Sequence, residues 1–287
     1  MVMDKSYKID MKNLSKSQIK KKISKNFVKN SGINPETNTR PIAVILAGIP
    51  GSGKTEFISS LFTDNKNFKQ QFLRIDLDEI VKIFKDYSPE NDYKFRPIGN
   101  AIVENIFDKA IAGNYNFVLD GTFGSSKAIF NIKRLIKHDY FINIYIMVES
   151  AERAWNFTKI RELKTKRKIK KDDFLESIKN VKDNLKELEK IEYSSVSIRF
   201  VDKSWINEEY NVLDEFDIDE LYLEWYNEDI QLILERVKME IIKKKIIIKR
   251  DIARQKKILN TLNDKRTLEK AAKGAIKLQR DLAGLNK

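Results

Sequence analysis

Short apolar runs alternate with longer amphipathic stretches over residues 41–201. The apolar runs, which predict strands, cover residues 41–47, 72–76, 117–120, 141–148 and 196–201. Helical patterns separate them, at residues 78–85, 97–112, 127–137, 151–164 and 171–190. Strand alternating with helix predicts an α/β fold, a parallel five-stranded sheet wrapped by helices, with ligands at the carboxyl ends of the strands.

The two ends of the chain carry other patterns. Residues 15–29 begin at a serine and have apolar positions at four-residue spacing, which predicts an amphipathic helix. After the last predicted strand the chain is acidic at residues 214–220. Residues 230–285 contain no proline, and their pattern predicts a long helix. We therefore expect an N-terminal helix and connector at 1–40, a catalytic domain at 41–205, and an acidic segment followed by a basic helical extension at 206–287.

The composition excludes several kinds of chemistry. The chain has no cysteine and a single histidine, His138, so a disulfide framework, a thiolate zinc site and a histidine-based triad are not expected. Acid and base catalysis must then fall to carboxylates. No apolar run approaches the length of a membrane span and no signal core opens the chain, so we expect a cytoplasmic protein without a membrane partner.

Most of the net charge of +13 lies at the C-terminal end. Residues 237–287 contain sixteen Lys and Arg against five Asp and Glu, which leaves the rest of the chain nearly neutral. Nucleic acid, if it is a partner, would therefore be bound by this C-terminal tail.

The first apolar run leads directly into a glycine-rich turn and a helical pattern. In such a Walker A loop, backbone N–H groups and the helix N-terminus bind phosphate oxygens, Lys54 reaches the β- and γ-phosphates, and Thr55 ligates Mg²⁺. The pattern predicts that the chain binds ATP and Mg²⁺. The predicted loop residues are Gly48, Pro50, Gly51, Ser52, Gly53, Lys54 and Thr55.

Carboxylates follow two of the predicted strands. Asp76 and Asp78 end the second strand, where one would face the nucleotide, as a catalytic base or as a metal contact through water, and the other would cap the next helix. Asp120 and Thr122 follow the third strand, where capping is again the alternative. After the fourth strand comes a segment rich in Lys and Arg, which could form a phosphate-binding lid or an ordinary solvated helix face.

Four blocks of this sequence, at residues 47–57, 75–80, 116–122 and 154–162, resemble the zeta toxin family. The resemblance implies a P-loop kinase-like fold and an ATP-dependent kinase that phosphorylates the 3′-hydroxyl of UDP-N-acetylglucosamine or a related nucleotide sugar. It also implies an antitoxin protein as a partner.

The resemblance also implies roles for individual residues. Lys54 and Thr55 would serve phosphate and Mg²⁺, Asp78 would be the base, and Arg161 and Arg167 would clamp the phosphates. Acceptor contacts would come from Glu104, Asp120 and Thr122. The chain departs from the sugar-nucleotide kinases on this acceptor side, with Asp120 in place of a glutamate and Gly124 in place of an arginine.

Another class of function remains open from the sequence alone. A polynucleotide kinase, or an ATPase directed to nucleic acid, would use the same loop and bind its partner through the C-terminal tail. The tail has no aromatic residue on which bases could stack, which counts against single-stranded nucleic acid.

Overall fold

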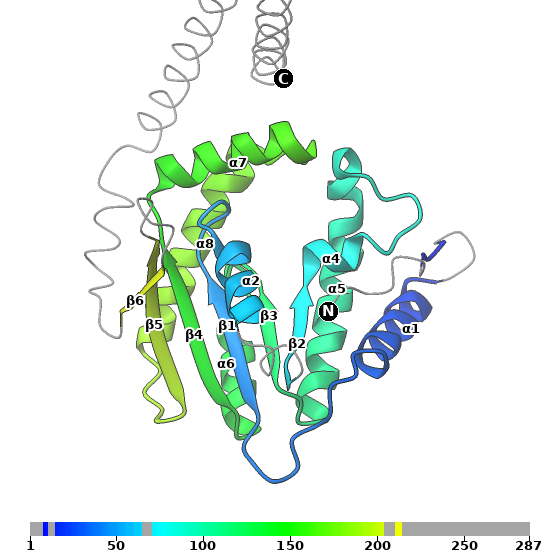
Figure 1. Cartoon of the computed structure of the whole chain (residues 1–287), viewed down its shortest axis with the longest axis vertical. Helices are drawn as coiled ribbons and strands as arrows, with labels where there is room; N and C mark the ends of the chain where they lie inside the picture. Colours follow the sequence, from blue (N-terminus) through cyan, green and yellow to red (C-terminus); the bar gives the residue numbers. More distant parts are fainter. Residues whose placement is uncertain (1–7, 11–14, 65–70, 204–209, 214–287) are drawn as a thin grey trace, which may run out of the picture.

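The computed structural model describes residues 8–10, 15–64, 71–203 and 210–213 of the chain (Figure 1). Its strands are β1 (Ile42–Ala47), β2 (Leu73–Asp76), β3 (Phe117–Asp120), β4 (Phe141–Val148), β5 (Val196–Lys203) and β6 (Tyr210–Leu213). Its helices are α1 (Lys16–Lys29), α2 (Lys54–Asp64), α4 (Leu77–Val81), η1 (Pro89–Asn91, a short 3₁₀ turn), α5 (Asp92–Ala112), α6 (Ala128–Lys137), α7 (Ala151–Thr165) and α8 (Lys171–Glu189).

The described strands form one sheet in the order β2-β3-β1-β4-β5-β6. The first five are parallel, as predicted, and β6 pairs antiparallel with β5 at the edge. This sixth strand was not predicted. Its four residues lie in the segment that the sequence assigned to the C-terminal extension, so the sheet continues beyond residue 205.

Alternate residues of β1 pack into different cores on the two faces of the sheet. Val44 and Leu46 pack with Phe57 and Ile58 of α2. Ala43 and Ile45 belong to the larger core, to which α5, α6 and α8 contribute. Because both faces are buried, β1 reads as a continuous apolar run, as strands of covered parallel sheets do.

Two predicted helices have different bounds in the structure. The helix predicted at 78–85 ends at Val81, because the following backbone pairs with Ile9, whose N–H donates to Ile83 O at 2.8 Å and whose carbonyl accepts from Lys85 N at 2.9 Å. The helix predicted to begin at Pro97 begins at Asp92, and Pro97 lies inside it.

The N-terminal helix was predicted correctly. Ser15 caps α1, and its hydroxyl accepts from Gln18 N at 3.2 Å while Gln18 Oε1 accepts from Ser15 N at 2.8 Å. The acidic segment and the basic helical extension lie outside the described residues. Within the part of the chain that the structure describes, no helix is both long and apolar enough to span a bilayer.

Candidate active site

The loop between β1 and α2 is the centre of the site. Gly48, Gly51 and Gly53 have φ values of +140°, +87° and +87°, a region that favours glycine, so the loop backbone depends on these three residues. Lys54 reaches back over the loop, and its Nζ donates to Gly48 O at 2.9 Å, Ile49 O at 2.7 Å and Ser52 Oγ at 3.2 Å. Burial lowers the pKa of this ammonium to about 8, although the nearby Asp120 carboxylate opposes the shift.

Helix α7 lies across the carboxyl ends of the strands, directly over this loop (Figure 1). A Cβ atom at Gly51 would lie 2.2 Å from the carbonyl oxygen of Ala154 in α7, whereas a Cβ at Gly53 would have no atom within 4 Å. Gly51 therefore allows close contact between loop and helix, and space remains beside Gly53.

This difference gives a stability prediction for the two glycines. Gly53→Ala introduces only the strain of a left-handed backbone, about 1–2 kcal/mol, but Gly51→Ala adds a clash with the backbone of α7. We expect urea unfolding to show a loss of about 1–2 kcal/mol for Gly53→Ala and of at least about 3 kcal/mol for Gly51→Ala. Equal losses would contradict the contact between the loop and α7.

Asp76, the last residue of β2, caps the N-terminus of α4. Its Oδ1 accepts from Asp78 N at 2.8 Å, at the start of α4. Arg74 lies two residues earlier on the same face of β2, and its Nη2 donates to Asp76 Oδ2 at 3.1 Å and to Asp120 Oδ2 at 2.6 Å. Burial and the neighbouring carboxylates of Asp120 and Asp78 raise the pKa of Asp76 to about 7.

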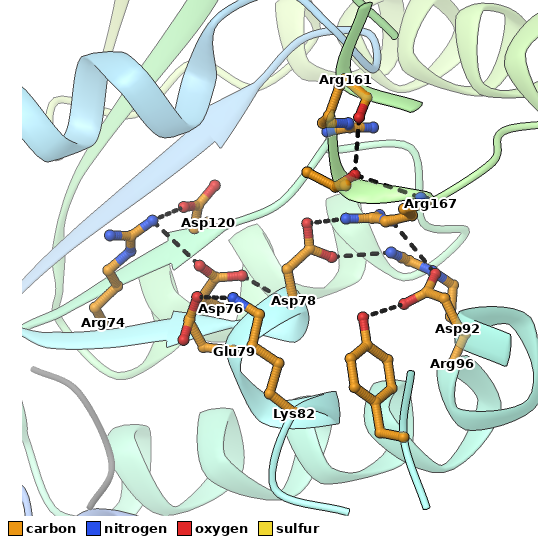
Figure 2. A network of polar contacts seen from close by, with 12 residues as sticks. Arg74, Asp76, Asp78, Glu79, Lys82, Asp92, Arg96, Asp120, Arg161 and Arg167 are labelled. Atoms are coloured by element: carbon orange, nitrogen blue, oxygen red, sulfur yellow. Dashed lines mark hydrogen bonds and ion pairs between the residues drawn. The ribbon is translucent and has the colours of Figure 1, made fainter. Parts of the chain in front are cut away.

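Asp78, by contrast, contacts two arginines from other elements. Arg167, just after α7, and Arg96, on α5, each donate to one oxygen of its carboxylate (Figure 2). Burial alone would raise the pKa of Asp78, but these two guanidinium groups hold it below its usual value. Lys54, Asp78 and Arg161 come from α2, α4 and α7 and lie close enough to influence one another electrostatically.

The three predicted acceptor residues have different contacts in the structure. Asp120 contacts Arg74, and burial raises its pKa. Thr122 accepts from Gly124 N at 3.2 Å through its hydroxyl, and its carbonyl accepts from Gly48 N at 3.1 Å, which joins it to the loop. The structure pairs Glu104 with Lys127 at 3.3 Å.

The site residues fit a nucleotide with Mg²⁺. The Nε of Arg161 is buried without a hydrogen-bond partner among the described residues, a cost that a phosphate oxygen would remove. Thr55 is exposed in the first turn of α2, where its hydroxyl could reach a metal. Both oxygens of Asp76 already accept hydrogen bonds, which suits contact with a metal through water. Within the described residues no group of three or more His, Cys, Asp and Glu side chains could hold a metal ion.

Sequence reasoning missed three charged residues of this site: Arg74, Asp92 and Arg96. Arg74 could have been found from the two-residue period of a strand, which places it on the face of Asp76. Asp92 and Arg96 have the i, i+4 spacing of a helical ion pair, but the predicted helix began after both. Trp155 is buried against Phe174 with a ring separation of 4.9 Å, and His138, the single histidine, is exposed at the end of α6.

Comparison with known families identifies the chain. The family model described as zeta toxin matches residues 26–213, which include the sheet and the residues around the loop. This chain belongs to the zeta toxin family. The match contains the loop, Asp78, Arg161 and Arg167.

Individual zeta toxins match over shorter segments. Toxin zeta of Enterococcus hirae is 35% identical over 91 residues, which cover 29% of this chain and 30% of that protein. Toxin zeta of Streptococcus agalactiae is 30% identical over 118 residues, which cover 37% of this chain and 39% of that protein. The matched segments thus span well under half the length of these curated relatives.

Solved structures share the fold at low sequence identity. A structure from the PezAT chromosomal toxin–antitoxin system of Streptococcus pneumoniae aligns with a TM-score of 0.56 at 18% identity, over 79% of this chain and 95% of the other. A chain of the AvrRxo1-ORF1:AvrRxo1-ORF2 complex aligns with a TM-score of 0.56 at 12% identity, over 96% of this chain and 89% of the other. These similarities support the α/β fold.

Proposed function

We propose that this chain is an ATP-dependent kinase that transfers the γ-phosphate of ATP to a sugar hydroxyl, namely the 3′-hydroxyl of UDP-N-acetylglucosamine or a related nucleotide sugar. The observation that carries the proposal is that Lys54, Asp78 and Arg161, which come from three different helices, lie close enough to interact electrostatically. Membership of the zeta toxin family supports the same chemistry. A cation for phosphate, a carboxylate and a lid arginine are the parts that phosphoryl transfer to an alcohol needs.

Each group has one task in the proposed reaction. The loop amides and Lys54 hold the β- and γ-phosphates. Asp78 accepts the proton of the acceptor hydroxyl, whose oxygen bonds to the γ-phosphorus as the bond from that phosphorus to the leaving ADP oxygen breaks. Arg161 and Arg167 donate to the oxygens of the phosphoryl group in transit. Mg²⁺, held by Thr55 and through water by Asp76, would neutralise phosphate charge.

The acceptor would lie beside Glu104, Asp120 and Thr122. Arg74 binds one oxygen of the Asp120 carboxylate, so the shorter side chain at this position is held by a neighbouring cation. We propose that this pair, rather than a free carboxylate, faces the acceptor.

A direct assay tests the proposal. The full chain is incubated with ATP, Mg²⁺ and a panel of UDP-sugars, and the products are analysed by mass spectrometry, with Lys54→Ala as the inactive control. We expect two products, ADP and a UDP-sugar that carries one additional phosphate on its sugar. If no UDP-sugar is phosphorylated although ATP binds, the proposed acceptor is wrong.

The same assay distinguishes the sugar-nucleotide kinase from the second candidate function, a polynucleotide kinase. The charge of residues 237–287 favours nucleic acid as an alternative acceptor. An oligonucleotide with a free 5′-hydroxyl is added in place of the UDP-sugar, at low and at physiological salt. Phosphorylation of the oligonucleotide without any sugar product would favour a polynucleotide kinase.

We propose that the protein acts in the cytoplasm and that its partner there is an antitoxin protein. A neighbour of this fold comes from a toxin–antitoxin system, which supports the idea. An antitoxin that covers the loop would compete with ATP, so nucleotide affinity should fall when such a partner is added.

A further inference from the structure

Arg96 of α5, which the proposed function does not use, contacts the candidate base, and Asp92 of the same helix contacts Arg96. The Nη2 of Arg96 donates to Asp78 Oδ1 at 2.9 Å, and the Nε of Arg96 donates to Asp92 Oδ2 at 2.6 Å. Asp92 and Arg96 are four residues apart on the helix, so they share a face, and that face is turned toward Asp78.

Arg167 closes this arrangement into a ring. It donates through Nη1 to Asp78 Oδ2, and its Nε lies 3.4 Å from Asp92 Oδ2 (Figure 2). Each of the two carboxylates therefore contacts both arginines. We call Asp78, Asp92, Arg96 and Arg167 the ion-pair ring.

The members of the ring are buried to different degrees. The side chain of Asp92 is 10% exposed and that of Asp78 is 38% exposed, so Asp92 is the inner carboxylate and Asp78 the outer one. Tyr87 further fixes Asp92, because its hydroxyl donates to Asp92 Oδ1 at 3.3 Å. A buried carboxylate with partners on both oxygens is a rigid anchor for Arg96.

Helices α4 and α5 are also joined by apolar contact outside the ring. Gly99 of α5 packs so closely on α4 that a Cβ atom there would lie 2.6 Å from Leu77 Cδ1 and 2.8 Å from Val81 Cγ1. Apolar contact already holds the two helices together, and the ring lies at the end of α4 that faces the site. Its effect therefore falls on the orientation of the Asp78 side chain.

We propose that Arg96, anchored by Asp92, is a positioning residue that fixes the orientation of the Asp78 carboxylate toward the acceptor hydroxyl. Arg167 belongs to the segment between α7 and α8, whereas Arg96 and Asp92 share one helix. In the proposed reaction Arg167 would leave the ring to contact phosphate, and Arg96 and Asp92 would stay. Arg96 then holds one oxygen of Asp78 and leaves Oδ2 for the acceptor proton. This inference rests on the proposed kinase function.

Variants of Arg96 and Asp92 test the inference in the full chain. Because a misplaced base slows the chemical step more than binding, Arg96→Met and Asp92→Asn should lower kcat by roughly 10- to 100-fold while the KM for ATP and for the acceptor change less than about threefold. Arg96→Lys keeps a donor for Asp78 and should recover part of the loss. Arg134→Met is the matched control, since Arg134 of α6 pairs with Asp108 of α5 at 2.6 Å, and its side chain is 27% exposed against 32% for Arg96.

A double variant separates positioning from a general structural role. If Arg96 acts through Asp78, Arg96→Met should cause little further loss of kcat in an Asp78→Asn background. Full additivity, or an Arg96→Met enzyme with normal kcat, overturns the inference while leaving the kinase proposal intact. A wild-type chain that transfers no phosphate overturns the proposed function, and the inference with it.

Discussion

Replacing Lys54 with alanine is expected to abolish detectable phosphoryl transfer and to weaken ATP binding by about 10- to 100-fold. The loss of affinity follows because a hydrogen bond to a charged group contributes about 1.5–3 kcal/mol. The loss of turnover should be at least about 100-fold, because Lys54 also stabilises charge on the phosphoryl group in transit. Calorimetric titration with ATP and Mg²⁺, followed by a turnover assay, measures both effects.

Lys82→Ala is the control for this variant. Lys82 is an exposed lysine of the same region, which contacts Glu79 at 2.5 Å and lies outside the loop. Its replacement should leave ATP affinity and turnover at wild-type values. If Lys54→Ala binds and turns over ATP as the wild type does, the loop is not a triphosphate site.

Replacing Asp78 with asparagine should lower kcat by about 100- to 10,000-fold, the usual contribution of a general base. ATP affinity should be retained or should rise, because the change removes a negative charge near the phosphates. Asparagine keeps the size of the side chain, but only its single carbonyl oxygen can accept, so one of the two hydrogen bonds from Arg96 and Arg167 is lost. Steady-state kinetics with the acceptor identified by mass spectrometry measure the loss in kcat.

Glu79→Gln provides the comparison for Asp78→Asn. Glu79 is the next residue of α4, with a side chain that is 51% exposed, and it pairs with Lys82 rather than with the lid arginines. This variant should have normal kcat. An Asp78→Asn enzyme with normal turnover would mean that another group receives the acceptor proton.

The parallel sheet and the loop could be predicted from sequence because each restricts which residue types can occur in it. Strands covered on two faces must be apolar throughout, as residues 42–47 are, and the left-handed backbone of the loop requires glycine. These are local constraints that leave a direct mark on residue type. Strand β6 has no such residue pattern, because a short antiparallel edge strand depends on its pairing with β5.

The polar contacts of the site could not be predicted because they depend on tertiary structure. Pro97 indicates a helix start, yet α5 begins five residues earlier and so brings Asp92 and Arg96 to Asp78. Likewise, the sequence left Asp120 as either an acceptor contact or a helix cap, and it did not predict that Arg74 on the neighbouring strand binds the Asp120 carboxylate. Opposite charges on separate elements become partners only when the fold sets their distance.

A crystal structure of the full chain with Mg²⁺ and a non-hydrolysable ATP analogue tests the central claim most directly. We expect Lys54 Nζ to exchange the carbonyl oxygens of Gly48 and Ile49 for β- and γ-phosphate oxygens, with Arg161 Nε within hydrogen-bond distance of the terminal phosphate. Asp78 should face the same phosphate. A nucleotide bound elsewhere, or a loop in which Lys54 keeps its carbonyl partners beside a bound triphosphate, would contradict the account.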